Sequence, residues 1–118
     1  MTTTRSSILC DPGAVVVTRI RFAEGTGTKR RPAVVLTDSP YHDSRADAIV
    51  VALSTQRGAS YYGDCDLYDW RDAGLPRPTK AKGVLQTIDR STIERQLGTL
   101  SSSDLDRVRD SVRLILCL

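Results

Sequence analysis

The first half of the chain carries the alternation typical of β-strands. Residues 14–22 are rich in β-branched side chains, and their two faces are Val15, Val17, Arg19, Arg21 and Val16, Thr18, Ile20, Phe22. Residues 32–37 predict a second strand, and AEGTGTKR between them predicts a long hairpin connection. Residues 47–54 form a nearly continuous apolar run, which is typical of a central strand buried on both faces. The pattern favours a mainly β fold.

The second half predicts shorter strands and one strong helix. Acidic and apolar residues alternate over 64–67, and the prolines of 73–80 predict a loop or extended segment. KGVLQTI and RQLGTL predict two strands, joined by a turn in which Asp89 caps one helical turn. Ser101 is expected to cap a terminal amphipathic helix with apolar positions Leu105, Val108, Val112 and Leu116 and polar positions Asp106, Arg107, Arg109, Asp110 and Arg113.

Composition is consistent with one domain of modest core, spanning residues 1–118. The chain is 40% hydrophobic, and its formal net charge of +3 suits a polyanionic partner without proving one. Its apolar runs are too short to span a bilayer, and its first residues lack the apolar segment of a signal peptide. We therefore expect a cytoplasmic protein that does not interact with membranes, with an α+β fold in which a small curved sheet carries the terminal helix.

Few residues offer metal or covalent chemistry. Cys10, Cys65 and Cys117 are far apart and are interpreted as small buried hydrophobes. His42 is the only histidine; it lies in the turn-rich segment DSPYHDSR and is expected to be exposed. The aspartates of the middle segment lack the pattern of a calcium loop and are interpreted as a solvated acidic face: Asp64, Asp66, Asp69 and Asp72. No metal or cofactor is predicted.

Positive charge is concentrated in TGTKRRPAVVL, where Lys29, Arg30 and Arg31 immediately precede Pro32. The residues alone favour a solvated hairpin edge that discourages strand pairing, and an anion site is the alternative. A second basic group and several aromatic side chains would suit RNA backbone and bases: Arg77, Lys80, Lys82, Tyr61, Tyr62 and Trp70. Trp70 is equally compatible with a core or an interface.

The order of these segments carries a family resemblance. A Gly-rich loop and Arg-Pro precede a strand, a later strand ends in Ala52-Leu53-Ser54-Thr55-Gln56, and the second half contains AGLPRP, TIDRSTI and QLGTLS. No single piece is specific, but their order and spacing from Pro12 onward resemble the MazF/PemK family of toxin endoribonucleases.

The resemblance implies a small SH3-like β-barrel that forms a homodimer and cuts single-stranded RNA at short motifs without a metal. It also implies a type II toxin–antitoxin system, with a MazE-like cognate antitoxin and operator DNA bound only through the antitoxin complex. The family's catalytic arginine and hydroxyl match Arg31 and Ser54, with Thr55 beside it. The residues expected to bind RNA are Thr28, Lys29, Arg30, Gln56, Arg57, Arg77, Lys80, Lys82 and Gln86.

The chemistry of metal-free RNA cleavage agrees with this assignment. The 2′-hydroxyl must lose a proton, the phosphorane charge must be stabilised, and the 5′-oxygen must gain a proton. The guanidinium of Arg31 suits the second task because its planar fork matches phosphate oxygens. The expected ends are a 2′,3′-cyclic phosphate and a 5′-hydroxyl. The general base stays unassigned, as does the choice between the hydroxyls of Ser54 and Thr55.

Two departures from the family pattern concern specificity and activity. Ala14 stands where the family usually has aspartate, and Gln86 stands where it often has arginine. A CcdB-like toxin that binds DNA gyrase through its C-terminal helical surface is the alternative function. A catalytically silent regulator that binds nucleic acid is a third.

Overall fold

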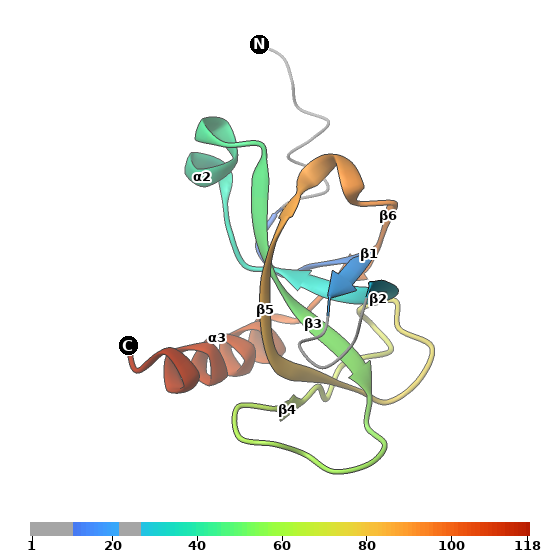
Figure 1. The fold of residues 1–118 in the computed structure, drawn as a ribbon. Helices are drawn as coiled ribbons and strands as arrows, with labels where there is room; N and C mark the ends of the chain where they lie inside the picture. Colours follow the sequence, from blue (N-terminus) through green and yellow to red (C-terminus); the bar gives the residue numbers. More distant parts are fainter. Residues whose placement is uncertain (1–10, 22–26) are drawn as a thin grey trace.

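Six antiparallel strands form one strongly curved sheet in the computed structural model, which describes residues 11–21 and 27–118 (Figure 1). The elements in chain order are β1 (Ala14–Arg21), β2 (Thr28–Val35), α2 (Ser39–Ser44), β3 (Asp47–Thr55), β4 (Cys65–Asp66), β5 (Thr79–Asp89), the one-turn helix η1 (Arg90–Thr92), β6 (Arg95–Thr99) and α3 (Ser102–Leu116). The spatial order is β4-β5-β3-β2-β1-β6, so β3 lies inside the sheet as its apolar run predicted. The predicted α+β fold with a terminal helix is confirmed.

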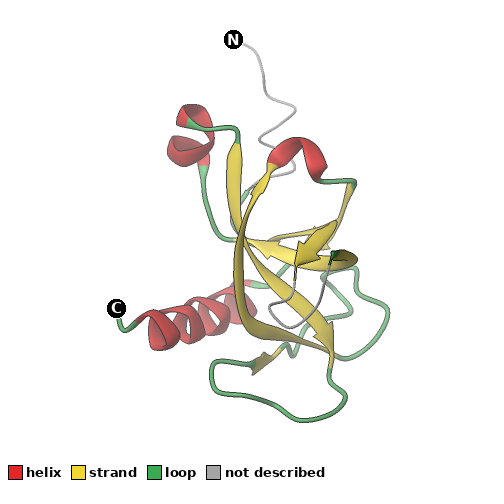
Figure 2. Ribbon diagram, viewed as in Figure 1, coloured by secondary structure: helices red, strands yellow, loops and turns green. Residues whose placement is uncertain are grey.

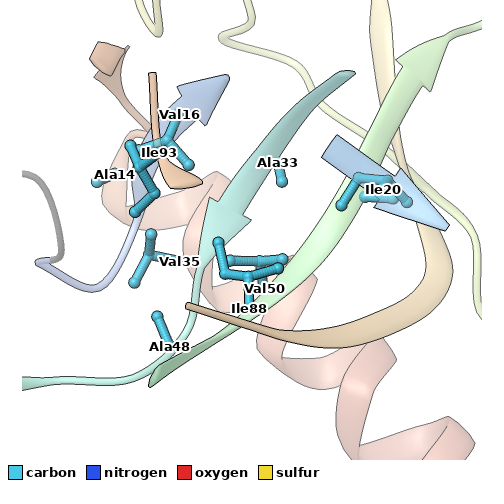
Figure 3. Close-up of a cluster of buried hydrophobic side chains, with 10 residues drawn as sticks. Ala14, Val16, Ile20, Ala33, Val35, Ala48, Val50, Ile88 and Ile93 are labelled. Atoms are coloured by element: carbon cyan, nitrogen blue, oxygen red, sulfur yellow. The ribbon is translucent and has the colours of Figure 1, made fainter. Parts of the chain in front are cut away.

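Both faces of the central strands are buried. The first core cluster contains Ala14, Val16, Ile20, Ala33, Val35, Ala48, Val50, Ala52, Ile88 and Ile93 (Figure 3). The second core cluster contains Val15, Val34, Val51, Leu53, Leu67, Ala73, Leu75, Ala81, Leu100 and Val108. Neighbouring residues of β1, β2 and β3 therefore contribute to opposite clusters, and a slip of one residue would exchange the two faces. This double burial fixes the strand register.

Helix α3 packs beside β4 and β5, and the two longest loops of the described chain flank β4 (Figure 2). The Ser101 hydroxyl accepts a hydrogen bond from Asp104 N at 3.2 Å, which confirms the predicted cap. Asp104 is fully buried, and its carboxylate accepts hydrogen bonds from Tyr68 N and Asp69 N while pairing with Arg107. These contacts fasten the start of the helix to the loop after β4.

The first strand pair is longer than predicted. β2 begins at Thr28, and Lys29, Arg30 and Arg31 pair with Ile20, Arg19 and Thr18 of β1. The prediction that Lys29 and Arg30 belong to the hairpin loop was wrong, because β1 offers backbone partners to both. Phe22 of the predicted first strand, residues 23–26 of the predicted connection, and Cys10 lie outside the described residues.

The segment DSPYHDSR forms α2 rather than turns alone, with Pro40 in its first turn, where a missing N–H costs no helical hydrogen bond. His42 is 5% exposed, and its Nε2 lies 2.7 Å from Thr37 Oγ1. The prediction that this histidine is exposed was therefore wrong. Burial lowers the pKa of His42, and the nearby charge of Arg90 lowers it further.

Three smaller expectations also need correction. Cys117 is exposed rather than buried, and Cys65 is half-buried and packs against the second core cluster. Asp64 is not part of a solvated face, since its side chain is 3% exposed. On α3, Leu116 is 51% exposed rather than packed against the sheet. No helix of the described chain is long and apolar enough to cross a membrane.

Candidate active site

A cleft of about 400 Å³ opens where β2 and β3 approach the loop before β5. Its lining combines the predicted catalytic residues with further basic and apolar side chains: Arg30, Arg31, Pro32, Leu53, Ser54, Thr55, Leu75, Pro76, Arg77 and Thr79. Arg31, Ser54 and Thr55 come from two different strands, so the fold brings together residues that are more than twenty positions apart in the chain. Leu75, Pro76 and Thr79 complete the cleft and were not singled out from the sequence.

Side-chain alternation places Arg31 and Ser54 on the same face of two neighbouring strands. Ala33 pairs with Ala52 at the last recorded step between β2 and β3. Arg31 and Ser54 lie two residues beyond this pair, so alternation gives both the face of the first core cluster. Leu53 and Leu75 belong to the second core cluster, so the cleft collects side chains from both faces. Thr55 is the last residue of β3, lies on the face of Leu53 and also lines the cleft.

Arg31 has a guanidinium that is half-buried and available to an anion. Its Nη1 donates a hydrogen bond to Arg30 O at 2.8 Å, and no carboxylate in the described part of the chain forms an ion pair with it. Ser54 Oγ donates to Thr55 O at 3.2 Å. The remaining guanidinium donors can therefore bind a phosphate in the fork geometry that arginine favours.

Arg30 differs from its neighbour because its charge already has a partner. Its Nη2 lies 2.6 Å from Glu94 Oε1, and its Nε lies 3.1 Å from Glu94 Oε2. The hydrogen bonds and the charge of Glu94 raise the pKa of Arg30, and Arg30 lowers the pKa of Glu94. Nothing local in the sequence indicates this pair, whose members are sixty-four positions apart.

The segment that leaves the two hydroxyls is anchored to β5. Gln56 Nε2 donates to Thr79 O at 2.9 Å and to Leu67 O at 3.4 Å, so this side chain ties the segment after β3 to β5. Lys80 is 2% exposed, and its Nζ donates to Ala59 O at 2.9 Å. The prediction that Lys80 binds RNA from the surface was wrong, because its ammonium points into the protein.

The remaining predicted RNA contacts are more dispersed. Thr28, Lys29 and Arg57 are exposed but do not line the cleft. Lys82 Nζ lies 5.9 Å from the centre of the Tyr61 ring, and Tyr61 and Tyr62 are both exposed. Trp70 packs against the second core cluster, and Gln86 lines a different concavity. The structure therefore brings Arg30, Arg31, Ser54, Thr55 and Arg77 together and leaves the others apart.

The cleft is equipped to bind and polarise an anion. It offers one guanidinium without an acidic partner, a second from Arg77, and two hydroxyls beside an apolar floor of leucine and proline. Such donors stabilise charge that develops on a phosphorus centre, most strongly where water is partly excluded. Within residues 11–21 and 27–118, no group of three histidine, cysteine, aspartate or glutamate side chains could hold a metal ion.

Comparison with known proteins identifies a family and its fold. The sequence profile of PemK-like, MazF-like toxins of type II toxin–antitoxin systems matches residues 11–116. No curated protein sequence matches the chain.

Three solved structures illustrate the shared fold. The MazE–MazF complex of Deinococcus radiodurans is similar at 21% identity with a TM-score of 0.72, covering 93% of this chain and 98% of that chain. Mycobacterium tuberculosis toxin MazF-mt6 is similar at 18% identity with a TM-score of 0.71, covering 89% of this chain and 97% of that chain. A mycobacterial endoribonuclease in complex with its cognate antitoxin is similar at 15% identity with a TM-score of 0.70, covering 92% of this chain and 95% of that chain.

Proposed function

The chain belongs to the PemK-like, MazF-like toxins of type II toxin–antitoxin systems, and we propose that it is an endoribonuclease that cleaves single-stranded RNA in the cytoplasm at a short sequence motif. The observation that carries the proposal is the convergence of Arg31, Ser54 and Thr55 on one cleft, beside Arg77. Two structural neighbours that are named endoribonucleases have the same fold and support the assignment.

The proposed reaction uses the RNA's own 2′-hydroxyl. Its oxygen attacks the adjacent phosphorus, the bond to the 5′-oxygen breaks, and the products are a 2′,3′-cyclic phosphate and a 5′-hydroxyl. Arg31 donates to the non-bridging oxygens as charge develops, and the hydroxyl of Ser54 or Thr55 adds one more donor. Because the guanidinium supplies this charge stabilisation, the reaction is proposed to need no metal.

RNA binding outside the reacting phosphate falls to the basic side chains around the cleft. Arg77 lines it directly and would bind a neighbouring phosphate. Lys29, Arg57 and Lys82 lie at or near the surface beyond the cleft, where they would contact the backbone of a longer strand, with Thr28 beside Lys29. Lys80 has no part in this surface because it is buried.

The proposed partners follow from the family. Two of the three neighbours described above are complexes with an antitoxin, which supports a MazE-like protein as the inhibitor of this chain. We propose a homodimer that reaches operator DNA only within the antitoxin complex, and a single domain over the whole chain.

The test is to incubate the purified protein and its Arg31→Ala variant with a long, unstructured RNA in EDTA and to map the new ends. Discrete cuts with 5′-hydroxyl ends from the native protein alone are expected. Absence of cuts from a folded, antitoxin-free sample, or equal cutting by the variant, would contradict the proposal.

One observation favours a second candidate. Apolar side chains are exposed at the end of α3, with Leu114 and Leu116 each 51% and Leu118 85% exposed. A CcdB-like toxin would use this helical end to bind DNA gyrase. In that case, toxicity would be lost on replacing Leu114 and Leu116 with serine and would survive Arg31→Ala.

A further inference from the structure

The ion pair between Arg30 and Glu94 lies at the border of the cleft. Arg30 lines the cleft, whereas Glu94 lines a separate concavity between β1 and β5. The Arg30 guanidinium donates three hydrogen bonds to the Glu94 carboxylate, through Nη2 at 2.6 Å and through Nε at 3.0 and 3.1 Å. The cation next to Arg31 in the chain is therefore held toward a carboxylate that does not line the cleft.

The fold leaves the Arg30 side chain a second orientation. Because side chains alternate along β2, Arg30 lies on the face of Val34 and the second core cluster. Leu53 of the same cluster lines the cleft, so this face opens into it. The two side chains of the ion pair are 54% and 38% exposed, and exposed pairs contribute little free energy. A guanidinium released from Glu94 can therefore turn into the cleft.

Glu94 also balances a group of arginines. Hydrogen bonding from Arg30 is the main cause of its lowered pKa, and the nearby charges of Arg19 and Arg95 add to the effect. Arg19 lies directly opposite Arg30 in the pairing of β1 with β2, and like charges in that position repel. Since β2 lies between β1 and β3, a guanidinium repelled by Arg19 would move toward β3 and the cleft.

We propose that Glu94 is a positioning residue that keeps the Arg30 guanidinium away from the reacting phosphate, so that this phosphate is bound by Arg31. The inference rests on the proposed function and concerns how the RNA is held for cleavage.

Two adjacent guanidiniums would compete for one phosphate. Arg31 follows Arg30 directly, and its Nη1 donates to Arg30 O at 2.8 Å. A released Arg30 would strengthen binding of the uncut RNA and draw the phosphate away from the position in which Arg31 stabilises the phosphorane. Binding that is stronger in the ground state than in the transition state slows the chemical step. Loss of Glu94 is therefore expected to tighten RNA binding and to slow cleavage.

The first measurement is RNA affinity in Glu94→Gln, which removes the charge and keeps the size of the side chain. The probe is a fully 2′-O-methylated RNA of mixed sequence, which lacks the attacking hydroxyl. Its dissociation constant is measured by fluorescence anisotropy at several salt concentrations. Glu94→Gln is expected to bind about fivefold more tightly at low salt. Its slope of log K against log salt should be steeper by about 0.7, which corresponds to one further phosphate contact on a single strand.

The second measurement is the single-turnover rate at saturating protein, on an unmodified RNA that the native protein cuts. Glu94→Gln is expected to cleave about tenfold more slowly, because the phosphate is held out of place. A purely structural role of Glu94 would weaken binding when the residue is replaced. Tighter binding together with slower cleavage therefore distinguishes positioning from a general loss of structure.

Two further variants serve as controls. Asp110→Asn removes an exposed carboxylate that pairs with Arg113 at 3.0 Å on α3, and it changes the net charge by the same amount. It should alter affinity and rate by less than about twofold, since a charge outside the cleft is largely screened by salt. The double variant Arg30→Gln/Glu94→Gln should match Arg30→Gln in both measurements, because no guanidinium remains for Glu94 to hold.

The outcomes separate this inference from the proposed function. Equal or weaker RNA binding by Glu94→Gln, an unchanged cleavage rate, an equal effect of Asp110→Asn, or slower cleavage by the double variant than by Arg30→Gln would overturn the inference. If the native protein cuts no RNA, but Glu94→Gln binds the methylated RNA more tightly and Arg30→Gln abolishes that gain, the nuclease proposal is wrong and the restraint of Arg30 by Glu94 stands.

Discussion

The buried pair of Lys80 and Asp64 provides a quantitative prediction for Lys80→Met. The two side chains are 2% and 3% exposed, and Lys80 Nζ lies 3.9 Å from Asp64 Oδ2. The ammonium also donates to Ala59 O at 2.9 Å and lies 3.4 Å from Ser60 Oγ. These contacts hold the loop that follows the cleft hydroxyls against β5. Methionine fills the same space without the charge, so the substitution removes the electrostatic contacts and keeps most of the packing.

The expected cost follows from what remains unpaired. Removing one partner of a buried ion pair costs about 3–5 kcal/mol in typical proteins. Here Asp64 would keep hydrogen bonds from Tyr61 N and Gly83 N, each at 2.9 Å, so its charge would stay partly compensated. We therefore expect Lys80→Met to lower the free energy of unfolding by about 3 kcal/mol, the lower end of that range. This loss corresponds to a fall in Tm of roughly 12 °C for a domain of this size.

Urea unfolding followed by circular dichroism measures this loss of stability. Lys82→Met is the control, because Lys82 lies on the same strand, is half-buried and has no hydrogen bond or ion pair in the described part of the chain. This substitution should change the free energy of unfolding by no more than about 0.5 kcal/mol. The double variant Lys80→Met/Asp64→Asn should lose less stability than the sum of the two single variants. A loss for Lys80→Met within about 1 kcal/mol of the control would refute the reasoning.

Three further outcomes are expected. His42 has a lowered pKa in the folded state, so the unfolded chain binds the proton more readily. The free energy of unfolding, measured from urea curves at two pH values, should therefore fall as the pH decreases from 6.5 through the folded pKa. The His42→Gln variant should show no such fall. Asp104→Ala should lower unfolding free energy by about 3 kcal/mol in urea, because two backbone donors and Arg107 lose their acceptor. Gly74→Ala should lower Tm far more than Gly27→Ala in a thermal melt; both have positive φ, but only at Gly74 would a Cβ collide with Leu97 O.

Elements with a strong local pattern could be predicted from the sequence. The apolar run of β3, the helical spacing of α3 and the caps at Asp89 and Ser101 each depend on residues within a few positions. Arg31 and Ser54 were identified through family resemblance, and both line one cleft because they continue β2 and β3 beyond the last paired residues, Ala33 and Ala52.

Contacts between distant segments could not be predicted in the same way. Lys80 looks like a surface cation until Asp64 and the loop at Ala59 surround it. His42 lies in a segment of turn residues, yet Arg90 donates to His42 O at 2.9 Å and helps to hold α2 against the sheet. Each of these depends on pairing across the fold, which no local pattern records.

The most direct test of the central claim is the rate of single-turnover cleavage of one short RNA by Arg31→Ala, with Arg113→Ala as the control. Arg113 is an exposed arginine of α3 that lies outside the cleft, so both substitutions change the net charge equally. If Arg31 stabilises the phosphorane, its removal should slow cleavage by about a hundredfold or more, and the control should cleave at the native rate. Equal rates for the two variants would contradict the assignment of the cleft as the active site.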